Sequence, residues 1–88
     1  MGLRKPSKEL TDILAENLRH LRNQKGISQE DLAELSGIHR TYVGSVERGE
    51  RNVTLSSLEM LASALGVSVI QLLTRKPRPH DDSNQNAG

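Results

Sequence analysis

Residues 39–48 carry the side chains with the clearest potential for recognition chemistry. If they form a helix, with about 100° between successive residues, one side of it is polar. The side chains on that side are Arg40, Thr41, Gly44, Ser45 and Arg48. Arginine can donate a bidentate pair of hydrogen bonds to guanine O6 and N7, and threonine or serine can bond a base edge or touch a thymine methyl group. The pattern predicts a face that fits the major groove of DNA; the alternative is an ordinary solvated helix face.

Gly44 supports the recognition hypothesis. Glycine inside a helix costs ~1 kcal/mol relative to alanine, so a helix with a purely structural role has little reason to contain it. A position without a side chain would instead let the helix lie close to the base pairs.

Other kinds of site find little support in the sequence. His20, His39 and His80 have no ligand spacing and the chain has no cysteine, which argues against a metal and predicts no cofactor. His39 is better placed for a role near a helix N-cap. Ser45 and Glu47 have no histidine partner in a plausible pocket, so we predict that the protein is not an enzyme.

Five helices and no strands are predicted to position these residues. Apolar residues recur at helical spacing over residues 8–25, and four shorter segments follow between clear start and stop signals. The expected signals are Gly26, Ser28, Gly37, Gly49, Thr54, Gly66, Ser68 and Pro77. The third helix is predicted over residues 39–48, and Asp31 is expected to complete a capping box with Ser28.

The second and third of these helices have the requirements of a helix-turn-helix. Ala33 supplies a small residue where the two helices cross, and Gly37 supplies a turn residue that tolerates positive φ. Val43 and Val46 give the third helix a stripe that can press on the core. These mutual spacings are more specific than two consecutive helices alone.

Composition limits the fold class further. The chain has 88 residues, 34% of them hydrophobic, and Tyr42 is its only aromatic residue, which favours a single all-α domain with an aliphatic core. The apolar runs are too short to span a bilayer and no signal peptide is evident, so we expect a cytoplasmic protein. We expect a basic N-terminal arm at residues 1–8, the helix-turn-helix domain at residues 9–74 and a disordered polar tail at residues 75–88.

From Gly26 to Leu73 the sequence resembles the repressor-type helix-turn-helix family, which includes the XRE, lambda and 434 repressor-like proteins. Its segment RTYVGSVERGERN is similar to the controller proteins of restriction-modification systems, which are small dimeric autoregulators. The resemblance implies a five-helix repressor-like domain that binds double-stranded DNA sequence-specifically and regulates transcription.

The resemblance also implies roles for individual residues. The expected base contacts are Arg40, Thr41 and Ser45. The expected backbone contacts are Gln29, Tyr42, Arg48, Arg51 and Asn52, with base contact left open for the last two. Arg22 and Glu47 match an ion pair that joins the first helix to the third, which makes Glu47 structural rather than catalytic.

The predicted fifth helix suggests self-association. Val69, Ile70, Leu72 and Leu73 are spread around most of the circumference of a two-turn helix, so they cannot all face the core. We expect them to form a homodimer interface; the alternative is that they cover the ends of the first and fourth helices.

Two classes of function remain open. One is a homodimeric DNA-binding regulator, with RNA polymerase as a further candidate partner. The other is a helix-turn-helix protein-interaction module, such as an antitoxin or a coregulator. Small polar residues on the third helix favour DNA, whereas a leucine-rich face there would have favoured a protein.

Overall fold

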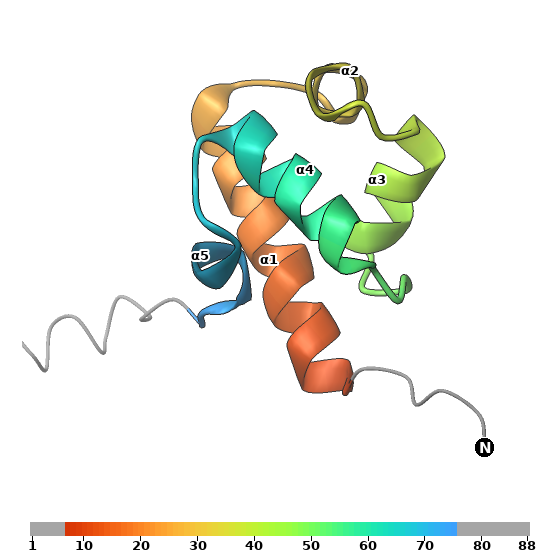
Figure 1. Cartoon of the computed structure of the whole chain (residues 1–88), viewed down its shortest axis with the longest axis vertical. Helices are drawn as coiled ribbons and strands as arrows, with labels where there is room; N and C mark the ends of the chain where they lie inside the picture. Colours follow the sequence, from red (N-terminus) through yellow and green to blue (C-terminus); the bar gives the residue numbers. More distant parts are fainter. Residues whose placement is uncertain (1–6, 76–88) are drawn as a thin grey trace, which may run out of the picture.

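The computed structural model describes residues 7–75, and this part of the chain folds into five helices without a strand (Figure 1). The helices are α1 (Lys8–Lys25), α2 (Gln29–Ser36), α3 (Arg40–Glu47), α4 (Leu55–Leu65) and α5 (Val69–Leu73). The expected all-α architecture is confirmed, and the third helix is one residue shorter at each end than expected, since His39 and Arg48 are its caps.

The expected terminal segments fall almost entirely outside the described residues. Of the basic arm at residues 1–8, Ser7 and Lys8 are described, and they cap and begin α1. Of the polar tail at residues 75–88, Arg75 alone is described, and its Nη2 lies 2.8 Å from Oε2 of Glu9 in an exposed ion pair.

Polar side chains at the N-termini explain where the helices begin. Ser28 Oγ accepts a hydrogen bond from the Asp31 amide at 2.9 Å, and the Asp31 carboxylate accepts one from the Ser28 amide at 3.0 Å. This reciprocal pair is the expected capping box, and it satisfies amide groups that have no acceptor within the helix. Ser68 and Gln71 form a second box at the start of α5, a partnership that the sequence analysis did not anticipate.

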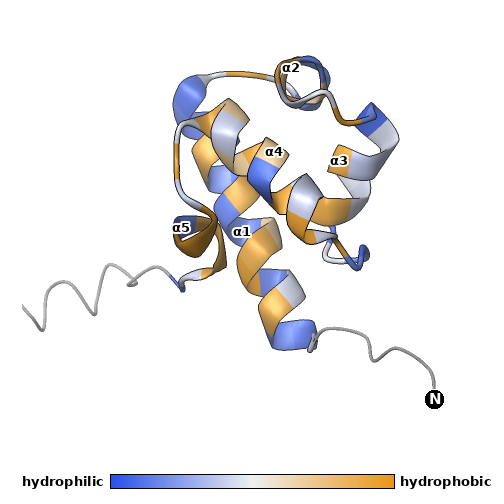
Figure 2. Cartoon of the chain, viewed as in Figure 1, coloured by the Kyte–Doolittle hydropathy of each residue, from blue (hydrophilic) through white to orange (hydrophobic). Residues whose placement is uncertain are grey.

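The helices enclose one aliphatic core, and Figure 2 shows their hydrophobic faces turned toward one another. The largest fully buried side chains come from all five helices and are Leu18, Leu32, Val43, Val46, Leu61, Leu65 and Leu72. In Figure 1, α4 crosses in front of α1, with the α2–α3 pair and α5 on opposite sides of them. Because α3 packs on α1 and α2, its orientation is fixed by the core.

The burial of Leu72 corrects the expectation for α5. Leu72 is completely buried in the monomer, where α5 packs against α1 and α4, so it is not available for a dimer interface. Val69 and Leu73 are half-buried against the same core, whereas Ile70 is 76% exposed. This five-residue helix buries one side, and the other side is left to solvent.

Asn17 of α1 holds the C-terminal end of α5. Its side chain is 3% exposed, and its Nδ2 lies 2.8 Å from the carbonyl oxygens of both Leu72 and Thr74. Carbonyl groups in the last turn of a helix have no intrahelical donor, and Asn17 supplies one. A helix of five residues is therefore stabilised at its start by a capping box and at its end by α1.

Two further properties limit the kinds of site present in residues 7–75. None of the described helices has the length and apolar character needed to cross a membrane. Within the same residues, no three histidine, aspartate or glutamate side chains lie together as metal ligands would.

Candidate nucleic-acid interface

The helices α2 and α3 form the two arms of the helix-turn-helix, joined by a tight turn at Gly37. Gly37 has a φ of 76°, in the left-handed region that favours glycine, and the amides of Gly37 and Ile38 both donate to the Ala33 carbonyl. Val43 and Val46 are buried on the inner side of α3, as expected. Their burial determines which side of α3 remains open to solvent.

The N-terminal end of α3 is exposed and carries free hydrogen-bonding groups. Arg40 and Thr41 are both exposed, and Arg40 has no ion-pair partner among residues 7–75. His39 is the N-cap residue, with its Nδ1 3.4 Å from the Thr41 amide. The two expected base-contact residues at this end are therefore accessible to a ligand.

The C-terminal end of α3 and the following loop carry two further exposed arginines. Arg48 Nε lies 3.0 Å from Oε1 of Glu50, and both side chains are more than half exposed. Arg51 and Asn52 are also exposed. Arg40, Arg48 and Arg51 thus give both ends of α3 positive charge that solvent can reach.

Ser45 does not lie where the helical wheel placed it. It is 7% exposed, and its Oγ donates to the Tyr42 carbonyl at 2.8 Å and accepts from Arg51 Nε at 3.0 Å. The expectation of an outward-facing Ser45 that contacts bases is wrong for this structure. The reason is that the loop after α3 folds back over this side of the helix, which a wheel for an isolated helix does not represent.

Tyr42 also differs from expectation. Its ring supports the guanidinium of Arg51, whose Cζ lies 4.6 Å from the ring centroid. Its hydroxyl is buried and has no hydrogen-bond partner among residues 7–75. A buried hydroxyl cannot reach a phosphate in this conformation, so the expected backbone contact of Tyr42 is not supported by its position.

Gly44 is buried, so the expectation that it faces outward is wrong for this structure. A Cβ at this position would lie 3.3 Å from Arg48 Nη1 and 3.6 Å from Gln29 Oε1. The first atom is the end of an exposed, flexible side chain that can move, and the second distance is ordinary van der Waals contact. Space alone therefore does not require glycine here, and a recognition reason for Gly44 stays a prediction.

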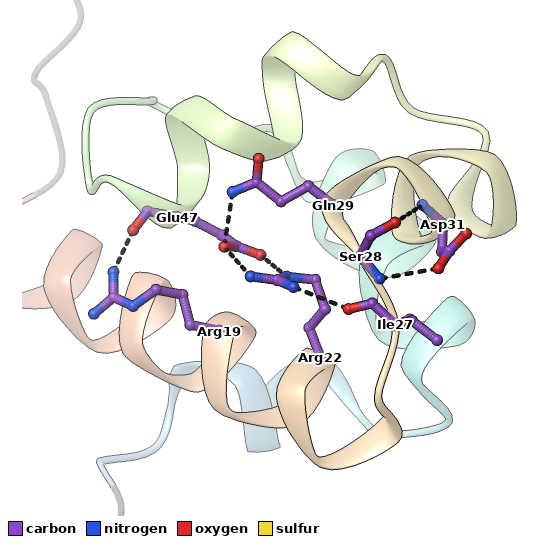
Figure 3. Close-up of polar contacts among 7 residues, drawn as sticks. All are labelled: Arg19, Arg22, Ile27, Ser28, Gln29, Asp31 and Glu47. Carbon is purple, nitrogen blue, oxygen red and sulfur yellow. Dashed lines mark hydrogen bonds and ion pairs between the residues drawn. The ribbon is translucent and has the colours of Figure 1, made fainter.

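A polar network around Glu47 fixes α3 to α1 and α2 (Figure 3). The buried Glu47 carboxylate accepts from Arg22 Nε at 2.6 Å, from Arg22 Nη2 at 3.0 Å and from Gln29 Nε2 at 3.0 Å. The hydrogen bond and the charge of Glu47 raise the pKa of Arg22 above its ordinary value. The ion pair expected between Arg22 and Glu47 is present, and it joins the first helix to the third.

Two further hydrogen bonds complete this network, and the sequence analysis anticipated neither. Arg19 donates from Nη1 to the Glu47 carbonyl, which satisfies an acceptor at the end of α3. Arg22 Nη1 donates to the Ile27 carbonyl at 2.9 Å and so holds the turn between α1 and α2. A signal was available, because Arg19 and Arg22 are three residues apart and lie on adjacent turns of one helix.

Gln29 is used within the protein through its side chain. Its Nε2 donates one of its two hydrogens to Glu47, which leaves the other for an outside acceptor. Its backbone N–H lies in the first turn of α2, where no intrahelical acceptor is available. Both routes to phosphate that the resemblance implied are compatible with the structure.

Comparisons with known proteins agree with this arrangement. The control protein C.SmaI of Serratia marcescens is 63% identical over 68 residues, which span 77% of this chain and 81% of C.SmaI. The structure of the restriction-modification controller protein C.AhdI from Aeromonas hydrophila matches with a TM-score of 0.68 and 50% identity, over 70% of this chain and 94% of that one. A hypothetical transcription factor from Neisseria matches with a TM-score of 0.75 and 41% identity, over 97% and 95% of the two chains. Residues 18–72 match the helix-turn-helix family HTH_3, and the chain belongs to that family.

Proposed function

We propose that the protein is a sequence-specific double-stranded DNA-binding transcriptional regulator that places α3 in the major groove. The observation that carries this proposal is the exposure of Arg40 and Thr41 at the N-terminal end of α3, without an ion-pair partner for Arg40 among residues 7–75. In helix-turn-helix proteins, the N-terminal residues of the second helix contact base edges. Arginine and threonine both have hydrogen-bonding geometry suited to that task.

Charge around α3 supports a division of roles. Arg40 and Thr41 would contact bases, and Arg48, Arg51 and Asn52 would lie along the sugar-phosphate backbone. Phosphate contacts position a protein on DNA, whereas base contacts select the sequence. The backbone N–H of Gln29 at the start of α2 adds a donor of the kind that helix N-termini offer to phosphates.

The relatives support a regulatory rather than a catalytic role. They are named control proteins and transcriptional regulators, among them C.SmaI and SinR of Bacillus subtilis. RNA polymerase is the partner that an activating role would require, and a cross-linking experiment at a bound promoter would test for it.

A homodimer is part of the proposal. An apolar groove of about 200 Å³ lies between the start of α1, the start of α4 and the end of α5, with Leu10, Val53, Leu55 and Leu73 on its walls. Of these lining residues Leu55 is 78% exposed, and Ile70 of α5 is 76% exposed. Exposed aliphatic side chains of this size favour a protein contact, and a second copy of this chain is the occupant we propose. A two-fold dimer on DNA would place its recognition helices about 34–36 Å apart, one turn of the duplex.

A protein-interaction module is the weaker alternative. The exposed side chains of α3 and its C-cap are Arg40, Thr41 and Arg48, and none of them is apolar. A helix that docks into a protein groove presents aliphatic or aromatic anchors at helical spacing instead.

The test begins with selection of bound duplexes from a random pool. Fluorescence anisotropy then compares the selected duplex with a scrambled one, and sedimentation measures the mass of the free and bound protein. Arg75→Ala is a matched control, because it removes an exposed arginine at the end of α5, away from the α2–α3 pair. Equal affinity for selected and scrambled duplexes would refute sequence-specific binding. A monomer at all concentrations, with and without duplex, would refute the dimer.

A further inference from the structure

We propose that Ser45 is a positioning residue that holds Arg51 ready for contact with DNA. This inference rests on the proposed DNA-binding function and assigns Ser45 a role other than base contact. Arg51 lies beyond the end of α3, in a loop, yet its Nε is 3.0 Å from Ser45 Oγ. Ser45 therefore connects a loop cation to the buried side of the recognition helix.

The hydroxyl of Ser45 has no hydrogen left for a base. A serine hydroxyl has one O–H donor, and here it is directed to the Tyr42 carbonyl at 2.8 Å. The same oxygen acts as the acceptor for Arg51 Nε. With 7% of the residue exposed, both partners of the hydroxyl lie within the protein.

Two further contacts restrain the same loop. The Ser45 carbonyl accepts a hydrogen bond from the Glu50 amide at 3.0 Å, so the backbone before Arg51 is tied to α3. The Tyr42 ring lies against the Arg51 guanidinium, with 4.6 Å between Cζ and the ring centroid. Stacking sets the plane of the guanidinium, and the bond from Nε sets its rotation within that plane.

This arrangement leaves the outer end of Arg51 available. Glu50 is the nearest acidic residue in the sequence, but its carboxylate pairs with Arg48, and Arg51 has no ion pair with residues 7–75. Since Nε is engaged, the two Nη groups remain as donors. They form a planar fork that suits an acceptor approached end-on, such as a phosphate or a guanine edge.

Pre-orientation explains why the protein would need Ser45. A free arginine side chain loses many rotamers when it binds, and a side chain already held in place loses fewer. Removing the Ser45 hydroxyl should therefore weaken DNA binding even though Ser45 does not touch DNA. The effect should vanish once Arg51 has lost its guanidinium.

A double-mutant cycle tests this dependence. The unmodified protein, Ser45→Ala, Arg51→Ala and the double variant are titrated against the duplex that the unmodified protein selects from a random pool. We expect Ser45→Ala to weaken binding about three- to tenfold in the presence of Arg51 and less than about twofold in the Arg51→Ala background. An equal loss in both backgrounds, or no loss in either, would overturn the inference.

Ser57→Ala is the matched control, because Ser57 is a half-buried serine of α4 whose hydroxyl accepts from the neighbouring Thr54 Oγ1 and lies outside the α2–α3 pair. It should leave affinity unchanged, and thermal unfolding should show that all variants fold. In the free protein, NMR of the Arg51 Nε–H should show slow exchange with solvent that Ser45→Ala accelerates; unchanged exchange would also overturn the inference. If the exchange responds but the unmodified protein binds no duplex, the proposed function fails while the Ser45–Arg51 contact itself stands.

Discussion

Replacing Glu47 by alanine should destabilise the protein severely, because it leaves the Arg22 guanidinium without its counter-ion. The Glu47 side chain is 3% exposed and that of Arg22 is 16% exposed, so water cannot fully replace the lost carboxylate. Arg22 would keep its bond to the Ile27 carbonyl, and the Gln29 amide would lose its acceptor. Removing one partner of a buried ion pair costs about 3–5 kcal/mol.

That loss is large on the scale of a small domain. Domains are stable by about 5–15 kcal/mol, and this one is short. For a domain of this size each kcal/mol lowers Tm by about 4–8 °C, so we expect Tm to fall by at least about 12 °C. Urea unfolding followed by circular dichroism measures the free energy of unfolding directly. DNA affinity should fall as well, since Glu47 joins α3 to α1.

Two companion variants define the cause. Glu50→Ala removes a carboxylate from an exposed pair with Arg48, and it should change the free energy of unfolding by no more than about 1 kcal/mol. Combining Glu47→Leu with Arg22→Met should recover most of the stability, because no buried charge is then unpaired. If Glu47→Ala unfolds at nearly the same urea concentration as the unmodified protein, the buried network does not hold α3 and the reasoning is refuted.

Three further predictions concern recognition and local electrostatics. Arg40→Ala should weaken the free energy of DNA binding by about 1–3 kcal/mol per half-site and relax the preference at one base pair. Arg48→Ala should instead weaken binding to all duplexes alike and reduce the slope of log affinity against log salt concentration by about one. Identical behaviour of the two variants in anisotropy across a salt series would contradict this division of roles. The hydrogen bonds from Ser28 lower the pKa of Asp31, so the stability that Asp31 contributes is complete above its ordinary pKa of 3.8 and is lost as the pH falls through the lower pKa of the folded state. Asp31→Asn should remove that part of the acid sensitivity, measured by urea unfolding at neutral and acidic pH. An unchanged acid sensitivity would argue against the capping box. Tyr42→Phe should leave the protein as stable or up to about 1 kcal/mol more stable, because its hydroxyl is buried and has no partner in the described part of the chain, and it should not alter DNA affinity. A clear loss of stability or of affinity would mean that the hydroxyl has a partner.

Local chemistry explains why most of the fold could be predicted. Apart from α3, each described helix starts with a Ser or Thr side chain that bonds an amide three residues later, and the sequence at Ser28 and Thr54 carries that information directly. The turn at Gly37 requires positive φ, which glycine adopts without strain. The Arg22–Glu47 pair was accessible only through the family resemblance, because its members are distant in the sequence.

The wrong expectations share a physical origin, which is the packing of one segment on another. Ser45 points outward on an isolated helix, but the loop through Arg51 covers it. Gly44 is buried by Gln29 from α2, and nothing near Gly44 in the sequence indicates that approach. Asn17 did carry a signal, since it is a polar residue beside Leu14 and Leu18 on the apolar side of α1.

The bond from Asn17 has a consequence for how such proteins can diverge. Asn17 recognises the carbonyl groups of Leu72 and Thr74, which belong to the main chain and do not depend on side-chain identity. The fold therefore constrains the inner side of α5, through Leu72, but makes no demand on the exposed side chain of Ile70. In the proposed homodimer, substitutions at Ile70 would change which copies associate without unfolding α5, so two regulators of this fold in one cell could acquire separate pairing preferences while keeping the same architecture.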